Sequence, residues 1–132
     1  MTKVKFYIFM FLGVLSSQCF ASDWVLLNDD PEMIIEWDRG NIHDHEGRKA
    51  VRKRISWKKE QVMDNGIRFK FTIQLLLYSC KEKTESIVAI SNFSSERKLV
   101  YKGDIGPIVQ RTQSYKGYKD YNDVERMLKN VC

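Results

Sequence analysis

The sequence predicts an α+β domain, an antiparallel sheet of about five or six strands with a C-terminal helix packed on it and tied to it by a disulfide. Three observations lead to this prediction. Apolar and polar residues alternate with a period of two through much of the chain. The period changes to that of a helix near the C-terminus. Two cysteines, Cys80 and Cys132, remain once an N-terminal export segment is set aside.

The N-terminal segment has the three-part layout of a bacterial secretory signal. Lys3 and Lys5 precede an apolar run from Phe6 to Leu15, and a short tail of mostly small or polar residues ends at Ala21. The run of about ten residues is too short to cross a bilayer core of about 30 Å. We therefore expect a protein exported to the periplasm or to the outer membrane and cell surface.

Cleavage after Ala21 divides the chain into a signal peptide at 1–21 and a single domain at 22–132. An alternative is a lipoprotein signal with Cys19 as the modified residue, although Gln18 directly before it fits that pattern poorly. Loss of the two signal lysines lowers the formal net charge from +5 to +3. A charge this small does not call for a nucleic-acid partner, and none is expected.

The cysteines of the exported domain form an even pair. Cys19 leaves with the signal, so Cys80 and Cys132 can bridge in an oxidising compartment. A metal site and free thiols are the alternatives, but two cysteines alone cannot complete a structural zinc site, which usually has four ligands. We therefore expect a disulfide and no cofactor.

The first half of the domain contains three strand patterns. Trp24–Leu27 and Met33–Trp37 are short apolar runs, separated by the turn residues of 28–31. The clearest alternation covers Val51–Lys58 and favours a half-buried strand. One face of this strand carries Val51, Lys53, Ile55 and Trp57, and the other carries Arg52, Arg54, Ser56 and Lys58.

The second half begins with a tight turn at Asp64–Gly66 and a long strand at Ile67–Tyr78 that leads to Cys80. Further strands are expected at Ser86–Phe93 and Lys98–Tyr101, and the pattern breaks at 102–107. In the long strand we expect the apolar positions to face the core, and both faces to be buried toward its end. The expected inward set is Ile67, Phe69, Phe71 and Ile73, and the outward set is Arg68, Lys70, Thr72 and Gln74.

The C-terminal segment is expected to be a helix. Asn122 as N-cap and Glu125 three residues later resemble a capping box. A helix of about nine residues is marginal alone, so the bridge from Cys132 would hold it against the sheet. The apolar residues at helical spacing are Val124, Met127, Leu128 and Val131.

Candidate sites are few. His43 and His45 could ligate zinc or copper from one face of a strand, but Gly47 follows closely and favours a solvated hairpin turn, which is the preferred interpretation. The chain has no serine in a Gly-x-Ser-x-Gly setting and no Gly-rich phosphate loop. We therefore expect a protein that is not an enzyme.

Two groups of residues could bind a macromolecule. A basic strip on neighbouring strands could hold sulfated glycans, anionic lipid headgroups or acidic protein segments, and a Tyr/Lys segment could form a recognition loop. A solvated sheet face and a packed connecting loop are the alternatives. The strip contains Arg48, Arg52, Arg54, Lys58, Arg68 and Lys70, and the segment contains Tyr115, Tyr118 and Tyr121.

Several short motifs resemble the surface-adhesin protein E family of Gram-negative bacteria. They include Trp24 near the mature start, the run Ile34–Asp38 followed by Asn41-Ile42, the strand end at Tyr78–Cys80, and the terminal segment Val124–Cys132. The resemblance covers nearly the whole mature chain. It implies an antiparallel sheet with a disulfide-tied C-terminal helix, the same fold that the alternation predicts.

The resemblance also implies an adhesive function at the bacterial envelope. The partners would be extracellular-matrix or other envelope macromolecules, bound by a monomer or a dimer without enzymatic chemistry. Two other functions remain open at this point. One is a periplasmic accessory or ligand-binding domain with no adhesive role, and the other is a small metal-binding protein using His43 and His45.

Overall fold

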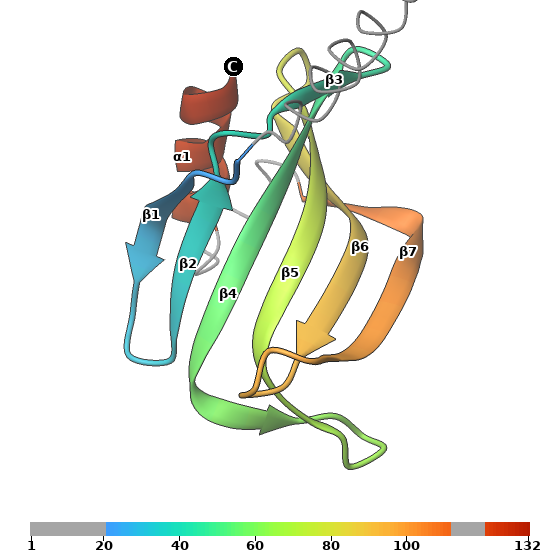
Figure 1. The fold of residues 1–132 in the computed structure, drawn as a ribbon. Helices are drawn as coiled ribbons and strands as arrows, with labels where there is room; N and C mark the ends of the chain where they lie inside the picture. Colours follow the sequence, from blue (N-terminus) through green and yellow to red (C-terminus); the bar gives the residue numbers. More distant parts are fainter. Residues whose placement is uncertain (1–20, 112–120) are drawn as a thin grey trace, which may run out of the picture.

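The structure, a computed structural model, describes residues 21–111 and 121–132, with the side chains of 105–111 and 121–122 left out of the description. In this part of the chain, seven strands form one antiparallel sheet and a single helix packs on it (Figure 1). The elements are β1 (Trp24–Asp29), β2 (Met33–Asp38), β3 (His43–His45), β4 (Arg48–Val62), β5 (Arg68–Ser79), β6 (Thr84–Phe93), β7 (Leu99–Arg111) and α1 (Tyr121–Val131).

The strands lie in the order β1-β2-β4-β5-β6-β7, and the short β3 pairs with the start of β4. The fold expectation is therefore confirmed in outline, with more strands than the five or six expected. With one helix against seven strands, α+β fits it only loosely. No helix in the described ranges is long and apolar enough to cross a membrane.

Helix α1 packs on one face of the sheet at its β1–β2 end, and this face is called the inner face and the opposite one the outer face (Figure 1). Met127 and Val131 of α1 pack into the inner-face core, together with Leu27 of β1. Arg126 of α1 donates a hydrogen bond from Nη1 to the carbonyl of Leu27 at 3.0 Å. The sheet residues of the core are Leu27, Ile35, Trp37, Val51, Ile55, Leu76, Tyr78 and Ile87.

The disulfide expectation is confirmed. Cys80 follows the end of β5, Cys132 follows α1, and their Cα atoms are 5.6 Å apart in the bridge. The helix begins at Tyr121, so Asn122 lies inside its first turn and not before it as the N-cap that the sequence suggested. The side chain of Asn122 lies outside the described residues, so the rest of the capping box has no structural account.

The expected turn around His43–Gly47 is narrower than predicted. Glu46 and Gly47 both have positive φ, at 50° and 77°, the backbone of a two-residue hairpin turn. His43 and His45 belong to β3, where they pair with Ala50 and Arg48 of β4. The turn chemistry was therefore read correctly at Gly47, and the short strand before it was missed.

The face prediction for β4 is confirmed, but that for β5 is wrong in its middle. Val51, Lys53 and Ile55 are buried on the inner face. The register places Thr72 opposite Ile55 and Phe71 opposite Ser56. Since directly paired residues share a face, Thr72 points inward and Phe71 outward.

The inner face tolerates Thr72 because its hydroxyl is fully bonded. Trp57 Nε1 donates to Thr72 Oγ1 at 3.0 Å, and Thr72 Oγ1 donates to Asn92 Oδ1 at 2.8 Å. A buried polar side chain in such a chain of hydrogen bonds costs little. The apolar residues Phe71, Ile73 and Leu75 are consequently left on the outer face.

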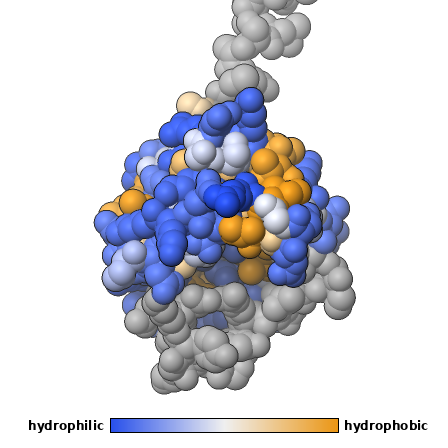
Figure 2. Space-filling model, turned by 90° about the horizontal axis from the view of Figure 1, so that it is seen from below, coloured by the Kyte–Doolittle hydropathy of each residue, from blue (hydrophilic) through white to orange (hydrophobic). Residues whose placement is uncertain are grey.

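The β4–β5 ribbon bends at its lower end, where the register shifts between Ser56 and Gln61 (Figure 1). Gly66, with φ of 84°, makes the turn predicted at 64–66. Figure 2 looks at this end of the molecule and shows apolar surface among hydrophilic residues. Val62 near the hairpin tip is 60% exposed and Leu99 at the start of β7 is 54% exposed.

Strand β7 is longer than predicted. The expected break at 102–107 is wrong, since β7 runs from Leu99 to Arg111. Its pairing with β6 is interrupted instead, with a register shift between Ile87 and Ala89. The glycines and proline of this stretch are accommodated by an irregularity in an edge strand, where proline is tolerated.

Candidate functional site

The outer face of the sheet is built around two arginines of β4. Arg52 and Arg54 alternate with the buried residues Val51 and Lys53, so the strand itself directs both guanidinium groups outward. On β2, Glu36 lies directly opposite Arg54. Glu36 accepts hydrogen bonds from Nε and Nη2 of Arg54 at 3.2 and 3.0 Å.

Trp24 of β1 completes this cluster. The Cζ atoms of Arg54 and Arg52 lie 4.4 and 5.5 Å from the centroid of its ring, within the distance of cation–π attraction. Trp24 pairs with Asp38 of β2, which places both residues on the outer face. One aromatic ring thus holds two guanidinium groups, each of which is also bonded to a carboxylate.

Asp38 is the buried centre of the cluster, with a relative exposure of 0%. Its carboxylate accepts hydrogen bonds from the backbone N–H of Asp23 and Gly40 and from the side chains of Asn41 and Arg52. Burial by itself raises the pKa of Asp38. The hydrogen bonds from Asp23, Arg52 and Asn41 and the positive charge of Arg52 outweigh it and hold the pKa below its ordinary value.

The same network fixes the segment that leads into β1. Arg52 Nη2 donates to Ser22 Oγ at 3.0 Å, and Arg39 pairs with Asp23 at 2.8 Å. Gly40 allows the close approach, because a Cβ there would lie 2.7 Å from the carbonyl oxygen of Ala21. Residues 21–24 are therefore seated against the turn that follows β2.

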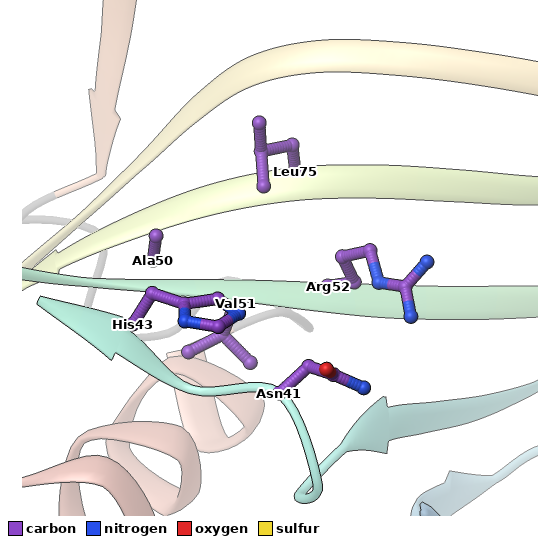
Figure 3. Close-up of a pocket in the computed structure, with 6 residues that line it drawn as sticks. All are labelled: Asn41, His43, Ala50, Val51, Arg52 and Leu75. Carbon is purple, nitrogen blue, oxygen red and sulfur yellow. The ribbon is translucent and has the colours of Figure 1, made fainter. Parts of the chain in front are cut away.

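A pocket of about 300 Å³ opens beside this cluster, near the β3–β4 hairpin. In Figure 3, Ala50, Arg52 and Leu75 extend to the side of the sheet away from α1, whereas Val51 points toward the helix. The imidazole of His43 extends along β4 in the direction of Arg52 (Figure 3). The lining residues are Asn41, His43, Ala50, Val51, Arg52 and Leu75.

The predicted basic strip is only partly assembled. Arg52 and Arg54 lie together, and alternation along β4 places Arg48 and Lys58 on the same face. Lys58 is paired with Asp29 at 2.7 Å. Beyond the bend of the ribbon, Arg68 bonds Glu60, and Lys70 bonds the carbonyl of Lys58. Arg68 and Lys70 therefore do not extend the basic strip of β4.

The Tyr/Lys segment has no structural account. Tyr115 and Tyr118 lie outside the described residues. Tyr121 is the first residue of α1, but its side chain is likewise outside the description. These three residues stay predictions.

The metal hypothesis gains no support from the described residues. His43 and His45 are both exposed, and by alternation they share one face of β3. No group of three or more His, Cys, Asp or Glu side chains within 21–111 and 121–132 is arranged to hold a metal ion. Asp44, between the two histidines, is bonded to Lys49.

Sequence reasoning missed the roles of Trp24, Asp38 and Leu75. Glu36 and Asp38 flank the buried Trp37, and this alternation could have placed both carboxylates on the face of Arg52 and Arg54. The exposure of Leu75, at 39%, had no sequence signal, because the run Leu75–Leu77 is uniformly apolar.

The motifs that carry the family resemblance thus occupy defined places in the structure. The Ile34–Asp38 run forms β2 and supplies two carboxylates, and the terminal segment forms the helix with the disulfide. The profile of the surface-adhesin protein E family matches residues 24–132. The chain belongs to this family. Searches of curated proteins and of solved structures found no match.

Membership in the surface-adhesin protein E family supports, in general terms, an adhesin-like protein of the cell surface. The family match begins at the first residue of β1 and ends after α1, so it includes every strand and helix that the structure describes.

Proposed function

We propose that this chain is an exported, non-enzymatic envelope protein that binds external macromolecules through the outer face of its sheet. The observation that carries the proposal is the exposed apolar side chain of Leu75 beside the Trp24–Arg52–Arg54 cluster. Tryptophan and arginine are the residues most enriched among those that dominate binding energy at protein interfaces. Adhesin E membership supports the same function.

The outer face suits binding better than the inner face because, among the described residues, the only helix packs on the inner face. On the inner face α1 packs over the core, and its Met127 is fully buried there. On the outer face, Phe71 and Ile73 are half-buried and form with Leu75 an apolar column along β5. A partner that covered this column would remove apolar surface from water, which favours association.

The partners proposed are extracellular-matrix or other envelope macromolecules, and the signal peptide at 1–21 is proposed to deliver the domain to the envelope. Arg48, Arg52, Arg54 and Lys58 are the proposed basic contacts on the outer face. Arg68 and Lys70 at the bend, with Tyr115, Tyr118 and Tyr121, are proposed as a separate peripheral contribution.

Surface exposure is the first test of this proposal. Whole cells that express the protein are treated with protease, and the released peptides and the mature N-terminus are identified by mass spectrometry. Release of peptides from the β4–β5 hairpin, with periplasmic control proteins intact, is expected. Complete protection of the protein would contradict a surface location and favour the periplasmic accessory role.

Binding through the outer face is tested with a matched pair of variants. Leu75→Ser removes an exposed apolar residue of the outer face beside the arginine cluster, and Val62→Ser removes one at the hairpin tip, which is 60% exposed. We expect the first change to weaken adhesion of expressing cells to immobilised matrix proteins by about tenfold, as for a central interface residue. The second should leave adhesion unchanged. Equal effects, or none, would contradict the assignment of this face.

A further inference from the structure

The outer face of the sheet has two unlike halves. The half over β1, β2 and β4 carries the cluster of Trp24, Arg52 and Arg54, in which each guanidinium group already bonds a carboxylate. The charges of this cluster are therefore matched within the protein. A partner gains little electrostatic attraction from it, because opposite charges at short distance largely cancel each other at longer range.

The half over β5, β6 and β7 is mainly apolar. Phe71, Ile73 and Leu75 form the column along β5. The register pairs Phe71 with Phe93 of β6, and Phe93 with Leu99 of β7, so these residues share the outer face. Leu99 is 54% exposed and Leu75 is 39% exposed. The apolar patch thus runs along β5 and crosses to β7 at the end of the sheet where β7 begins (Figure 1).

Strand β6 places small side chains in the middle of this half. Ala89 and Ser91 are the partners of Leu75 and Ile73 of β5. On their other side they pair with two exposed charged residues of β7. These are Asp104 opposite Ala89 and Lys102 opposite Ser91. A rounded element laid along β6 would therefore contact apolar side chains on the β5 side and charged side chains on the β7 side.

The dimensions of this half match an α-helix. Neighbouring strands lie about 4.8 Å apart, so β5 and β7 are roughly 10 Å apart, close to the diameter of a helix with its side chains. From Phe71 to Leu75 the strand rises about 13 Å, the length of about nine helical residues. The protein already packs a helix on its inner face, where Met127 and Val131 of α1 enter the core.

We propose that an amphipathic helix of a protein partner docks on this half of the outer face along β6, an inference that rests on the proposed function of the outer face. Its apolar side contacts Ile73, Leu75 and Leu99, a recognised mode of peptide binding. Its flank faces Lys102 and Asp104, which have opposite charges. An acidic and a basic residue four positions apart on the helix match both, since two strand residues and four helical residues each span about 6–7 Å.

This surface fits a protein helix better than a sulfated glycan or a lipid membrane. The centre of the half is apolar and has few groups that could bind a polar glycan. An anionic bilayer attracts clusters of lysine and arginine, whereas here Lys102 lies beside Asp104, and Arg97 lies over the ring of Phe71 with its Cζ 5.6 Å from the centroid. The rim thus carries both signs of charge, as the flank of an amphipathic helix does.

The test is an NMR titration of the protein as the cell processes it, with the disulfide intact. The probe is a synthetic peptide of about 18 residues, long enough to form a helix, made of leucine, alanine, glutamate and lysine with its leucines on one face. The control peptide has the same composition with the leucines distributed around the helix. We expect saturable shifts of the Leu75, Ala89 and Leu99 methyl signals with the first peptide only. Absence of these shifts, or equal shifts with both peptides, would overturn the proposal.

Two variants locate the docking position. Ala89→Tyr places a large ring in the path of the helix, on a strand that tolerates tyrosine well, and should weaken peptide binding by about tenfold or more. Leu26→Ser removes an apolar residue that is 61% exposed on the outer face of β1, outside the apolar half, and should leave binding unchanged. An Ala89→Tyr protein that folds normally and binds the peptide equally well would contradict the docking position.

Vesicles of anionic phospholipid distinguish a membrane from a protein partner. No vesicle binding through this half is expected. If vesicles bind the protein and Ala89→Tyr prevents it, the apolar half belongs to a lipid surface and the helix proposal is wrong. Peptide docking and cell adhesion are also separable. Adhesion that survives Ala89→Tyr retains the proposed function without the helix site, whereas peptide docking in a protein without adhesion removes the proposed function alone.

Discussion

Arg54 places its guanidinium carbon 4.4 Å from the centroid of the Trp24 ring while bonding Glu36 through two nitrogens. This relationship joins three adjacent strands, since Trp24 lies on β1, Glu36 on β2 and Arg54 on β4. The cluster therefore fastens the edge strand β1 to the rest of the sheet on the side that α1 does not cover.

Replacement of Trp24 by Ala should lower the free energy of unfolding by about 2 kcal/mol, because two cation–π contacts and half-buried ring area are lost. Trp24→Phe should lose less, since a ring remains beneath the guanidinium groups. Urea unfolding followed by circular dichroism measures both. Trp24→Ala with wild-type stability would show that β1 is held by α1 and the core alone.

Asp38 makes the stability of the fold depend on pH in the acid range. Its pKa is lowered in the folded state, so the unfolded chain binds the proton more tightly and stability rises with pH. The contribution is fully present above the ordinary aspartate pKa of about 3.9 and is lost as pH falls through the lower folded value. Replacement by Asn should therefore destabilise the protein at neutral pH and matter less in acid.

The measurement is urea unfolding of the wild-type and Asp38→Asn proteins at several pH values. The difference in unfolding free energy should be constant above about pH 5 and should narrow below about pH 4. Asp29→Asn, which changes an exposed carboxylate paired with Lys58, is the control and should show a small difference throughout. A difference for Asp38→Asn that persists unchanged to pH 2 would show that its carboxylate charge does not contribute.

The cluster also shows where sequence reasoning succeeds and where it stops. Alternation in β4 gave the correct faces for Val51, Arg52 and Lys53, because polar and apolar residues there differ clearly. In β5 the same rule failed, because the apolar residues Phe71 and Ile73 lie on the outer face and not on the core side. Which of the two alternating sets of β5 residues faces the core depends on the register between β5 and β4. This long-range pairing cannot be read from the sequence of β5 alone.

The disulfide could be predicted because two cysteines remain in a domain that we expect to be exported. The carboxylate partners of the arginines were not predicted. Arg54 and Glu36 are 18 residues apart, and Arg52 and Asp38 are 14 apart. Their contacts depend on the β2–β4 pairing and on the insertion of β3 between them in the chain. The pocket likewise combines residues of 41–52 with Leu75, which come together only through the β4–β5 register.

The disulfide should carry a large share of the stability. It joins residues 52 positions apart, and a loop of this length corresponds to roughly 4 kcal/mol in the chain-entropy description. Cys132→Ser should therefore lower the melting temperature by about 15 °C or more. Reductant should destabilise the wild type to a similar level and leave the variant unchanged. A variant that melts like the wild type would show that α1 is held by packing alone.

Lys53 and Glu85 form a buried ion pair on the inner face, with 7% and 4% of their side chains exposed. Glu85 Oε2 accepts hydrogen bonds from Lys53 Nζ at 2.9 Å and from the hydroxyl of Tyr78 at 2.6 Å. Lys53→Met leaves the carboxylate buried without its cation and should cost about 3–5 kcal/mol. The double change of Lys53→Met with Glu85→Met should be more stable than Lys53→Met alone, because an apolar pair needs no charge compensation. Calorimetric melting of the three proteins distinguishes these outcomes, and a single variant as stable as the wild type would mean that water reaches Glu85.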